Sequence, residues 1–320
     1  MDISSIYEPV QSGLEKVEER LWQLGAADSG ALKELLQHVL GQSGKRLRPA
    51  LTLLVGKACD CDPESLVPMA TAVELFHTAT LVHDDTVDGS ALRRGRPTVS
   101  SVWGGGRAVL FGDYLFALAA ELASTTGDLR VVTLFAQTLR TVSSSELGQS
   151  LRGFDLSQTK QRYYDSIASK TASLFVLATE SAAILSRVPE ELVVACRNYG
   201  YSLGMAFQVV DDILDFVGVE EDLGKPVGAD LLQGVVTLPV ILAIECNLGD
   251  NRVVQAVAQR DAQSLRALLE MAREASLIGE SYKVAGEFCS TARACAERLP
   301  EGRARQSLID LTRYVTERKK

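Results

Sequence analysis

The chain has 320 residues, of which 46% are apolar and 23% are charged, and its formal net charge at pH 7 is −8. An apolar share of this size supports a sizeable core, and the charged share is ordinary for a soluble protein. The acidic balance excludes a general nucleic-acid binder, which needs an excess of basic side chains on one face.

Targeting signals and disulfide patterns are missing from the sequence. The N-terminal segment MDISSIYEPV has no basic region followed by an apolar run, so we expect no signal peptide. The most apolar stretch, residues 108–123, is interrupted by Asp113 and Glu121, whereas a membrane span needs ~20 largely uninterrupted apolar residues. The six cysteines form no CxxC pair and no zinc-type cluster with histidine. We therefore expect a cytoplasmic protein without a transmembrane segment or a disulfide framework.

Helical periodicity dominates the whole chain. Apolar residues recur at three- and four-residue spacing, and alternating β-branched runs bounded by hairpin turns are missing. No linker and no repeat of fixed period divides the sequence, so we predict one all-α domain over residues 1–320, a large helical bundle around a deep central cavity. Residues 250–320 are expected to be helical, polar and peripheral. The other predicted helices cover residues 31–40, 65–85, 108–124, 129–149, 166–186, 191–216 and about 237–245.

The first functional candidate along the chain is a basic turn. Residues 44–49 have the sequence GKRLRP, which places Lys45, Arg46 and Arg48 behind a glycine and before a helix, a favourable place for an anion. A solvated surface is an equally good explanation for any basic group taken alone. The other candidate cations are Arg93 and Arg94 in a loop, and Lys170 and Lys225 in apolar or glycine-rich surroundings.

The helix predicted at residues 65–85 ends in the sequence HDDTVD. Asp84 and Asp88 lie four residues apart and share a helix face, with Asp85 one step around. Three carboxylates on one turn repel one another, so a cation should lie between them. His77 precedes Asp84 by two helical turns and faces the same side, which favours a role in anion binding over that of a satisfied core histidine.

The helix predicted at residues 191–216 ends in the same pattern, VVDDILDF. Asp211 and Asp215 repeat the four-residue spacing, with Asp212 beside Asp211. Carboxylate oxygens suit Mg²⁺, which completes its shell with water and phosphate oxygens. A solvent-facing helix end is the alternative for one such motif. Two motifs together with separate basic groups indicate a diphosphate substrate that is bridged to the protein by Mg²⁺ and by cationic side chains.

Segments over nearly the full length resemble the trans-isoprenyl diphosphate synthases, the polyprenyl synthetase family, in sequence, order and spacing. The resemblance is to long-chain members of the octaprenyl, heptaprenyl and solanesyl type. It implies a fold like that of the type I isoprenoid synthases, Mg²⁺ as cofactor and a homodimer. The chain departs from the family at Ser43, where a second glycine is common, and at Val235, where a lysine is common. The matching segments are GKRLRP (44–49), HTATLVHDDTVD (77–88), RRGRPT (93–98), GDYLFA (112–117), KTASLF (170–175), FQVVDDILDF (207–216), GKPVGADL (224–231) and TLP (237–239).

The resemblance also implies a role for individual residues. Asp84, Asp88, Lys170, Asp211 and Gln208 would carry the reaction. The metal set would be Asp84, Asp85, Asp88, Asp211, Asp212 and Asp215, with Asp212 and Asp215 acting through water and Asp212 also contributing to substrate binding. Arg93, Lys170 and Lys225 would hold the allylic diphosphate, and Lys45, Arg48, His77 and Arg94 would hold isopentenyl diphosphate. Thr171 and Gln208 would line the site of the carbocation.

The implied reaction condenses isopentenyl diphosphate with an allylic diphosphate to give an all-trans polyprenyl diphosphate. Cleavage of the carbon–oxygen bond forms an allylic cation, the isopentenyl double bond attacks it, and the departing diphosphate accepts the proton. One alternative is a geranylgeranyl (C20) diphosphate synthase. A class I terpene cyclase is less favoured, because it would not need GKRLRP, His77 or Arg94.

Side chains beneath the first motif bear on product length. Ala79 and Thr80 lie one turn before Asp84 and are both small, and each isoprene unit spans ~5 Å, about one helical turn. We expect the tail to pass them and reach roughly C30 or more, unless Ala79 only packs against a neighbouring helix. Asp113, in apolar company, is expected to be buried and paired. Candidates for a deeper floor are Phe76, Phe116, Leu122 and Phe135.

Overall fold

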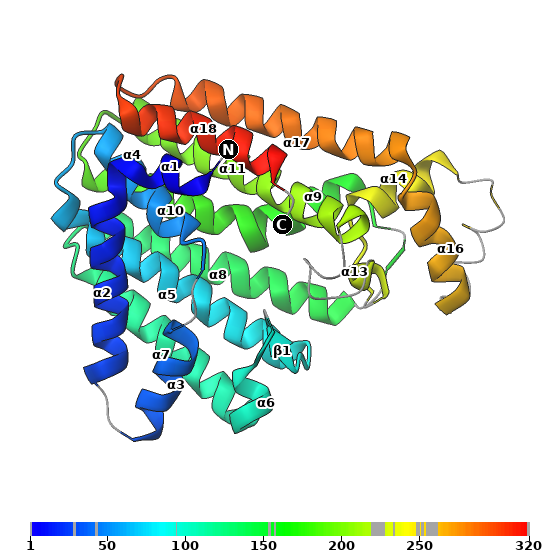
Figure 1. Ribbon diagram of the computed structural model, residues 1–320, viewed down its shortest axis with the longest axis horizontal. Helices are drawn as coiled ribbons and strands as arrows, with labels where there is room; N and C mark the ends of the chain where they lie inside the picture. Colours follow the sequence, from blue (N-terminus) through cyan, green and yellow to red (C-terminus); the bar gives the residue numbers. More distant parts are fainter. Residues whose placement is uncertain are drawn as a thin grey trace.

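The prediction of an all-α fold is confirmed in the computed structural model (Figure 1). The structure describes residues 2–27, 30–41, 44–93, 95–152, 155–156, 158–218, 228–232, 234–247, 250, 253 and 262–318. In these residues the only sheet is the two-residue antiparallel pair β1 (Leu92–Arg93) and β2 (Arg96–Pro97). The helical elements are α1 (Ile3–Tyr7), η1 (Glu8–Val10), α2 (Gln11–Ala27), α3 (Ala31–Leu40), α4 (Leu47–Ala58), α5 (Pro63–Val87), α6 (Val99–Trp103), α7 (Gly105–Ser124), α8 (Leu129–Arg152), α9 (Lys160–Ile167), η2 (Ala168–Ala172), α10 (Ser173–Leu185), α11 (Glu190–Val217), α13 (Ala229–Leu232), α14 (Leu238–Cys246), α16 (Ala262–Ala272), α17 (Ala275–Ala296) and α18 (Arg303–Glu317).

Helix α5 illustrates how local sequence sets the boundaries. Asp62 caps its N-terminus by accepting a hydrogen bond from the Glu64 backbone N–H at 3.2 Å, and Pro63 occupies the first turn, where its missing N–H costs nothing. The helix then runs to Val87, so the first aspartate motif forms its last turn. The sequence predicted residues 65–85, which is correct to within two residues at each end.

The prediction of one helix over residues 166–186 differs from the structure. Helix α9 begins earlier, at Lys160, and a π-helical turn, η2, separates it from α10. A π turn inserts one extra residue into the helix and is often found at functional sites. Hydrophobic periodicity cannot detect it, because the apolar stripe continues on either side.

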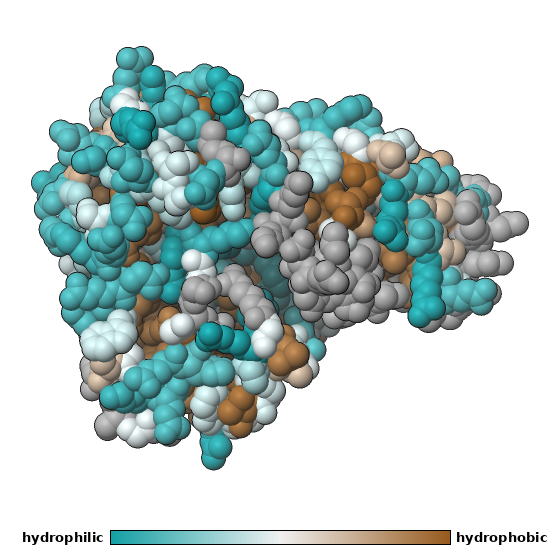
Figure 2. Space-filling view, in the orientation of Figure 1, coloured by the Kyte–Doolittle hydropathy of each residue, from teal (hydrophilic) through white to brown (hydrophobic). Residues whose placement is uncertain are grey.

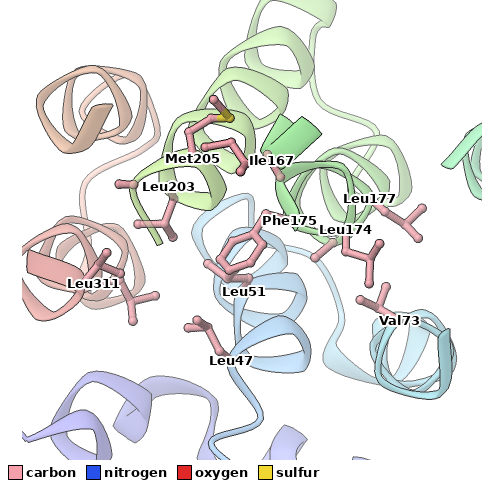
Figure 3. Packing of buried hydrophobic residues seen from close by; sticks show 14 of the residues in the cluster. Leu47, Leu51, Val73, Ile167, Leu174, Phe175, Leu177, Leu203, Met205 and Leu311 are labelled. Carbon is pink, nitrogen blue, oxygen red and sulfur yellow. The ribbon is translucent and has the colours of Figure 1, made fainter. Parts of the chain in front are cut away.

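The core is built where α4, α5, α10 and α11 pack against one another. Figure 3 shows side chains of these helices and of α18 pointing toward a shared interior, with Phe175 of α10 beside Leu51 of α4. Phe175 and Leu51 are fully buried, as is Val73 on α5. Among the described helices only α5 is long and apolar enough to cross a membrane. Its most apolar 18-residue stretch is 72% buried inside the bundle, as expected for a core helix.

The predicted peripheral position of residues 250–320 is wrong for α17 and α18. Helix α17 packs along α11, and α18 packs against α4 and α11 (Figure 1). Leu308, Leu311 and Val315 of α18 are fully buried. The polar composition of this region hides a narrow apolar stripe at helical spacing, and that stripe is enough to place α18 against the core.

Candidate active site

A cavity of about 740 Å³ opens between α5, α8, α10 and α11 and the turn that leads into α4. Figure 2 shows hydrophilic residues around a hollow in the middle of this face. Asp84 and Asp85 of the first motif and Asp211 of the second line the same cavity, so the two motifs converge across it. The other predicted site residues in its wall are Lys45, Arg48, His77, Thr80, Arg93, Lys170, Thr171 and Gln208.

Two consecutive residues of η2 join the motifs. The Nζ atom of Lys170 lies 3.5 Å from Oδ2 of Asp84. The neighbouring Thr171 hydroxyl donates a 2.6 Å hydrogen bond to Oε1 of Gln208, one helical turn before Asp211 and Asp212. The π turn therefore presents one side chain to each aspartate motif.

The first motif carries more negative charge than its neighbours balance. Lys170 also lies 2.9 Å from Oε1 of Glu146 on α8, so one ammonium is shared by two carboxylates. Burial raises the pKa of Asp84, and Glu146 adds to the shift while Lys170 opposes it. Partial desolvation at the end of α5 raises the pKa of Asp88 as well; Lys170 opposes this shift, and Asp84 and Asp85 add to it. Burial lowers the pKa of Lys170, but Asp84 and Glu146 outweigh it and the net shift is upward.

Asp85 is held in a different way from Asp84. The Arg93 side chain donates to both of its carboxylate oxygens, with Nε 2.8 Å from each. Because Asp85 is buried and Arg93 is about one-third exposed, the pair ties the hairpin formed by β1 and β2 to the end of α5. Asp88 caps α5 and is exposed.

The second motif is paired with the C-terminus of the described chain. Oδ1 of Asp211 lies 2.7 Å from the Arg318 guanidinium, which is only 3% exposed. The same guanidinium stacks on the Phe207 ring at 3.9 Å and donates to the Phe207 carbonyl at 2.6 Å. Burial raises the pKa of Asp211, and Arg318, Lys45 and Arg48 oppose the shift.

Asp212 and Asp215 point into the protein. Asp212 accepts hydrogen bonds from Tyr163 (2.6 Å) and Gln208 (2.8 Å) and does not line the cavity. Burial raises its pKa to about 8, although both hydrogen bonds lower it. Asp215 is also buried, and the backbone N–H of Asp230 donates to its Oδ2 at 3.3 Å.

The three cations of the basic turn at residues 44–48 all line the cavity but differ in their partners. The Lys45 ammonium lies 5.9 Å above the Tyr314 ring, and the Arg48 guanidinium 5.0 Å above that of Phe175. Both line the cavity near Asp211, as His77 does from α5. Arg46 also lines the cavity, but its guanidinium is bound by two carboxylates: it pairs with Glu18 and lies 2.7 Å from Glu74.

The structure separates the two residues that the sequence placed beneath the first motif. Thr80 lines the cavity, whereas Ala79 is fully buried and is not part of its wall. Phe76, one turn below Thr80, is also fully buried and packs edge-on against Phe116 and Phe135 with ring centroids 5.2 Å apart. These three rings form an aromatic cluster, and none of them lines the cavity. Leu122, the fourth candidate for a floor, is buried on α7.

The predicted burial of Asp113 is wrong, since its side chain is 63% exposed and its carboxylate lies 3.5 Å from Nε2 of His83. Asp113 occupies an outward-facing position of α7. The apolar residues beside it in sequence point in other directions. Val235, at the position where a lysine is common, is partly exposed, and its N–H bonds to the Asp230 carbonyl at 2.8 Å. Arg94, Lys225 and Ser43 lie outside the described residues.

The carboxylates of the two motifs suit a hard divalent cation such as Mg²⁺. In the described chain no three histidine, cysteine or acidic side chains already converge on one point. Mg²⁺ typically takes one or two carboxylates and fills its octahedron with water and phosphate oxygens. The carboxylate oxygens of Asp84 and Asp211, which face one cavity, match that requirement.

Three site residues were not identified from the sequence. Glu146 and Arg318 line the cavity, and Tyr163 binds Asp212 from outside it. Each reaches the site from a distant part of the chain, so no local spacing pattern reveals it. Tyr163 is the partial exception, because it lies seven residues, about two helical turns, before Lys170 and could therefore have been placed on the same helix face.

Comparison with known proteins gives consistent results. A family profile described as "Polyprenyl synthetase" matches residues 29–275. The heptaprenyl diphosphate synthase component 2 of Geobacillus stearothermophilus is 37% identical over 99% of both chains. The all-trans-nonaprenyl-diphosphate synthase (geranyl-diphosphate specific) of Rhodobacter capsulatus is 36% identical over 88% of this chain and 87% of its own. The crystal structure of a Caulobacter crescentus polyprenyl synthase, complexed with calcium and isoprenyl diphosphate, has a TM-score of 0.91 and 32% identity, covering 100% of this chain and 98% of that one.

Proposed function

Since this chain belongs to the polyprenyl synthetase family and is a trans-polyprenyl diphosphate synthase, we propose that it condenses isopentenyl diphosphate with an allylic diphosphate to give a product of roughly C30 or more. The observation that carries the proposal is the shared cavity, in which two aspartate motifs and two basic groups face one another. One basic group lies beside Asp84 and the other beside Asp211, which suits two diphosphate substrates bound side by side.

Asp84, Asp88 and Asp211 would hold Mg²⁺, and the bound ions would neutralise the diphosphate as it departs. The Caulobacter structure, with calcium and isoprenyl diphosphate, supports a divalent ion in this family of sites. Asp85 is already engaged by Arg93, and Asp215 faces inward. Arg93 reaches both oxygens of Asp85, whereas the Arg318 contact of Asp211 is made through Oδ1 and Lys170 lies 3.5 Å from Asp84, so Asp84, Asp88 and Asp211 are the better-placed ligands.

The chain's own residues carry the other steps. Lys170 and Arg93 would bind the diphosphate that leaves with the electron pair of the broken carbon–oxygen bond, while Lys45, Arg48 and His77 would hold isopentenyl diphosphate. The isopentenyl double bond then attacks the allylic cation, and the proton goes to the released diphosphate. This proton transfer needs no side-chain general base, because the diphosphate itself accepts the proton. Exclusion of water matters more, because water would quench the cation.

A long product is supported by the relatives and by Thr80. The two curated relatives are named for heptaprenyl and nonaprenyl products. In this chain a small side chain, Thr80, lines the cavity at the level where a bulky one would stop growth. We propose the aromatic cluster of Phe76, Phe116 and Phe135 as the floor. The C20 alternative would need the tail to stop above this cluster, and no bulky side chain on α5 does that at position 80.

A second copy of this chain is the proposed partner, and the cytoplasm the proposed location. Helices α7 and α8 pack on each other and expose the apolar side chains of Leu110 (70%) and Leu129 (78%), which a dimer would cover. The Geobacillus relative is named as one component of its enzyme, so a different subunit is the alternative occupant. Light scattering of the purified chain alone distinguishes them, since only self-association gives twice the monomer mass.

The function is tested by supplying purified protein with Mg²⁺, labelled isopentenyl diphosphate and each allylic starter in turn. We expect label in a polyprenyl diphosphate that chromatography sizes at about C30 or longer. A class I terpene cyclase would consume the allylic diphosphate without isopentenyl diphosphate, which would refute the proposal. A product that stops at C20 would refute the proposed chain length and leave the reaction type intact.

A further inference from the structure

A series of hydrogen bonds leads from a buried tyrosine to the cavity wall. The Tyr163 hydroxyl donates to Oδ2 of Asp212 at 2.6 Å, and Nε2 of Gln208 donates to Oδ1 of Asp212 at 2.8 Å. The Thr171 hydroxyl donates to Oε1 of Gln208 at 2.6 Å. Tyr163 and Asp212 are buried, whereas Gln208 and Thr171 line the cavity. Among the described residues, these hydrogen bonds connect the buried pair to the cavity wall through Gln208.

Asp212 faces a different direction from its neighbour Asp211. Successive residues of a helix are rotated by about 100°, and here that rotation turns Asp211 toward the cavity and Asp212 toward α9. Both carboxylate oxygens of Asp212 are engaged by donors from α9 and α11. This geometry makes Asp212 a poor candidate for water-mediated metal binding.

The contact with Asp212 fixes which way the Gln208 amide points. An ionised carboxylate oxygen only accepts hydrogen bonds. It can therefore bind the amide N–H₂ group of Gln208 but not the amide oxygen. Oδ1 remains the acceptor even if a proton rests between Oδ2 and Tyr163. The amide N–H₂ of Gln208 therefore lies on the buried side, and its oxygen lies on the side of Thr171, which lines the cavity.

We propose that Tyr163 and Asp212 are positioning residues that hold the Gln208 amide with its oxygen toward the forming allylic cation. The inference rests on the proposed function, because only a cationic intermediate gives this orientation a catalytic value. An amide oxygen stabilises nearby positive charge, whereas a rotated amide would direct two N–H donors at it. Asp212 then serves the cation site through Gln208.

The test compares Tyr163→Phe with Tyr164→Phe, a neighbouring tyrosine that is half-buried against Phe288 and does not line the cavity. Two allylic probes are titrated by calorimetry in excess Mg²⁺: an ammonium analogue with a positive nitrogen at the reacting carbon, and a neutral thiolodiphosphate. In Tyr163→Phe we expect about tenfold weaker binding of the ammonium analogue alone. We also expect a lower kcat with unchanged KM, and wild-type values in Tyr164→Phe.

Asp212→Asn provides the second variant if Tyr163→Phe does not fold. It is isosteric, and it should weaken the ammonium analogue selectively while leaving the Mg²⁺ concentration for half-maximal activity unchanged. A shifted Mg²⁺ requirement in either variant would assign Asp212 to the metal and overturn the inference. Equal weakening of both probes would also overturn it, because that pattern signals a structural role.

Failure of the inference is distinguishable from failure of the proposed function. Wild-type protein that transfers no label from isopentenyl diphosphate to any allylic starter would refute the proposed function. Active wild-type protein together with a Tyr163→Phe variant of unchanged kcat and unchanged affinity for the ammonium analogue would refute only the positioning role.

Discussion

Thr80 and Ala79 are adjacent on α5, yet only Thr80 borders the cavity. Thr80→Phe places a ring beneath Asp84, and we expect a product shorter by one or more isoprene units. Ala79→Phe places the same ring in a fully buried position, where overpacking costs about 1–3 kcal/mol. We expect it to lower Tm without shortening the product. Chromatographic sizing of the product and thermal unfolding of both variants check this. An unchanged product length in Thr80→Phe would show that the side chain at position 80 does not limit growth of the tail.

Among the helical elements, α11 and the π turn η2 approach each other closely at a glycine. A Cβ added at Gly204 would lie 2.6 Å from Cα of Ala172, in the π turn that carries Lys170 and Thr171. Gly204→Ala must displace that backbone, so we expect a loss of about 2–3 kcal/mol of stability and a lower kcat. Denaturant unfolding and steady-state kinetics measure the two effects.

Gly279→Ala on α17 is the matched control, because an added Cβ there meets no atom within 4 Å. Alanine favours the helix more than glycine does, so this variant should gain about 0.5–1 kcal/mol of stability. Its kcat should equal that of the wild type. A Gly204→Ala variant as stable and as active as Gly279→Ala would show that the close approach is unimportant.

The end of α18 is held against α11 by the side chain of Arg318. Arg318→Ala removes the buried cation that pairs with Asp211 and stacks on Phe207. Because Asp211 is partly exposed, we expect a modest loss of about 1–3 kcal/mol of stability. Arg313→Ala, an exposed position of the same helix, should change stability by less than about 0.5 kcal/mol. Equal unfolding midpoints for the two variants would contradict a stabilising role of the Arg318 contact.

At the scale of the whole molecule, clustered carboxylates make the metal-free protein sensitive to pH. The pKa of Asp212 is about 8 in the folded state against 3.8 for an ordinary aspartate, and those of Asp84, Asp88 and Asp211 are raised too. Between these values the folded chain binds more protons than the unfolded chain, so stability falls as pH rises. With a chelator present, Tm should decrease from pH 5 to pH 8. A Tm that rises over this range would contradict the burial argument.

The fold and the aspartate motifs were predictable because both are local. Hydrophobic periodicity gave α5 and α11 to within two residues, and the four-residue spacing put Asp84 and Asp211 at the ends of these helices. The family resemblance then supplied the reaction. The convergence of the two motifs on one cavity is not a local feature. It could be expected only because a diphosphate substrate needs cations from both motifs.

The remaining site residues depend on long-range packing. Arg318 reaches Asp211 across more than one hundred residues of sequence, and Tyr163 reaches Asp212 across 49. The expected burial of Asp113 is wrong because the apolar residues beside it in sequence are not its neighbours in space. Ala79 and Thr80 looked equivalent because spacing alone does not say which side of α5 meets the cavity.

We propose that the two aspartate motifs hold divalent ions around one diphosphate. Crystals grown with Mn²⁺ and an allylic thiolodiphosphate test it directly, because Mn²⁺ scatters anomalously. We predict anomalous peaks beside Asp84 and Asp88 and beside Asp211, all bonded to oxygens of the same diphosphate in the cavity. Peaks at only one motif, or a diphosphate bound outside the cavity, would contradict the account.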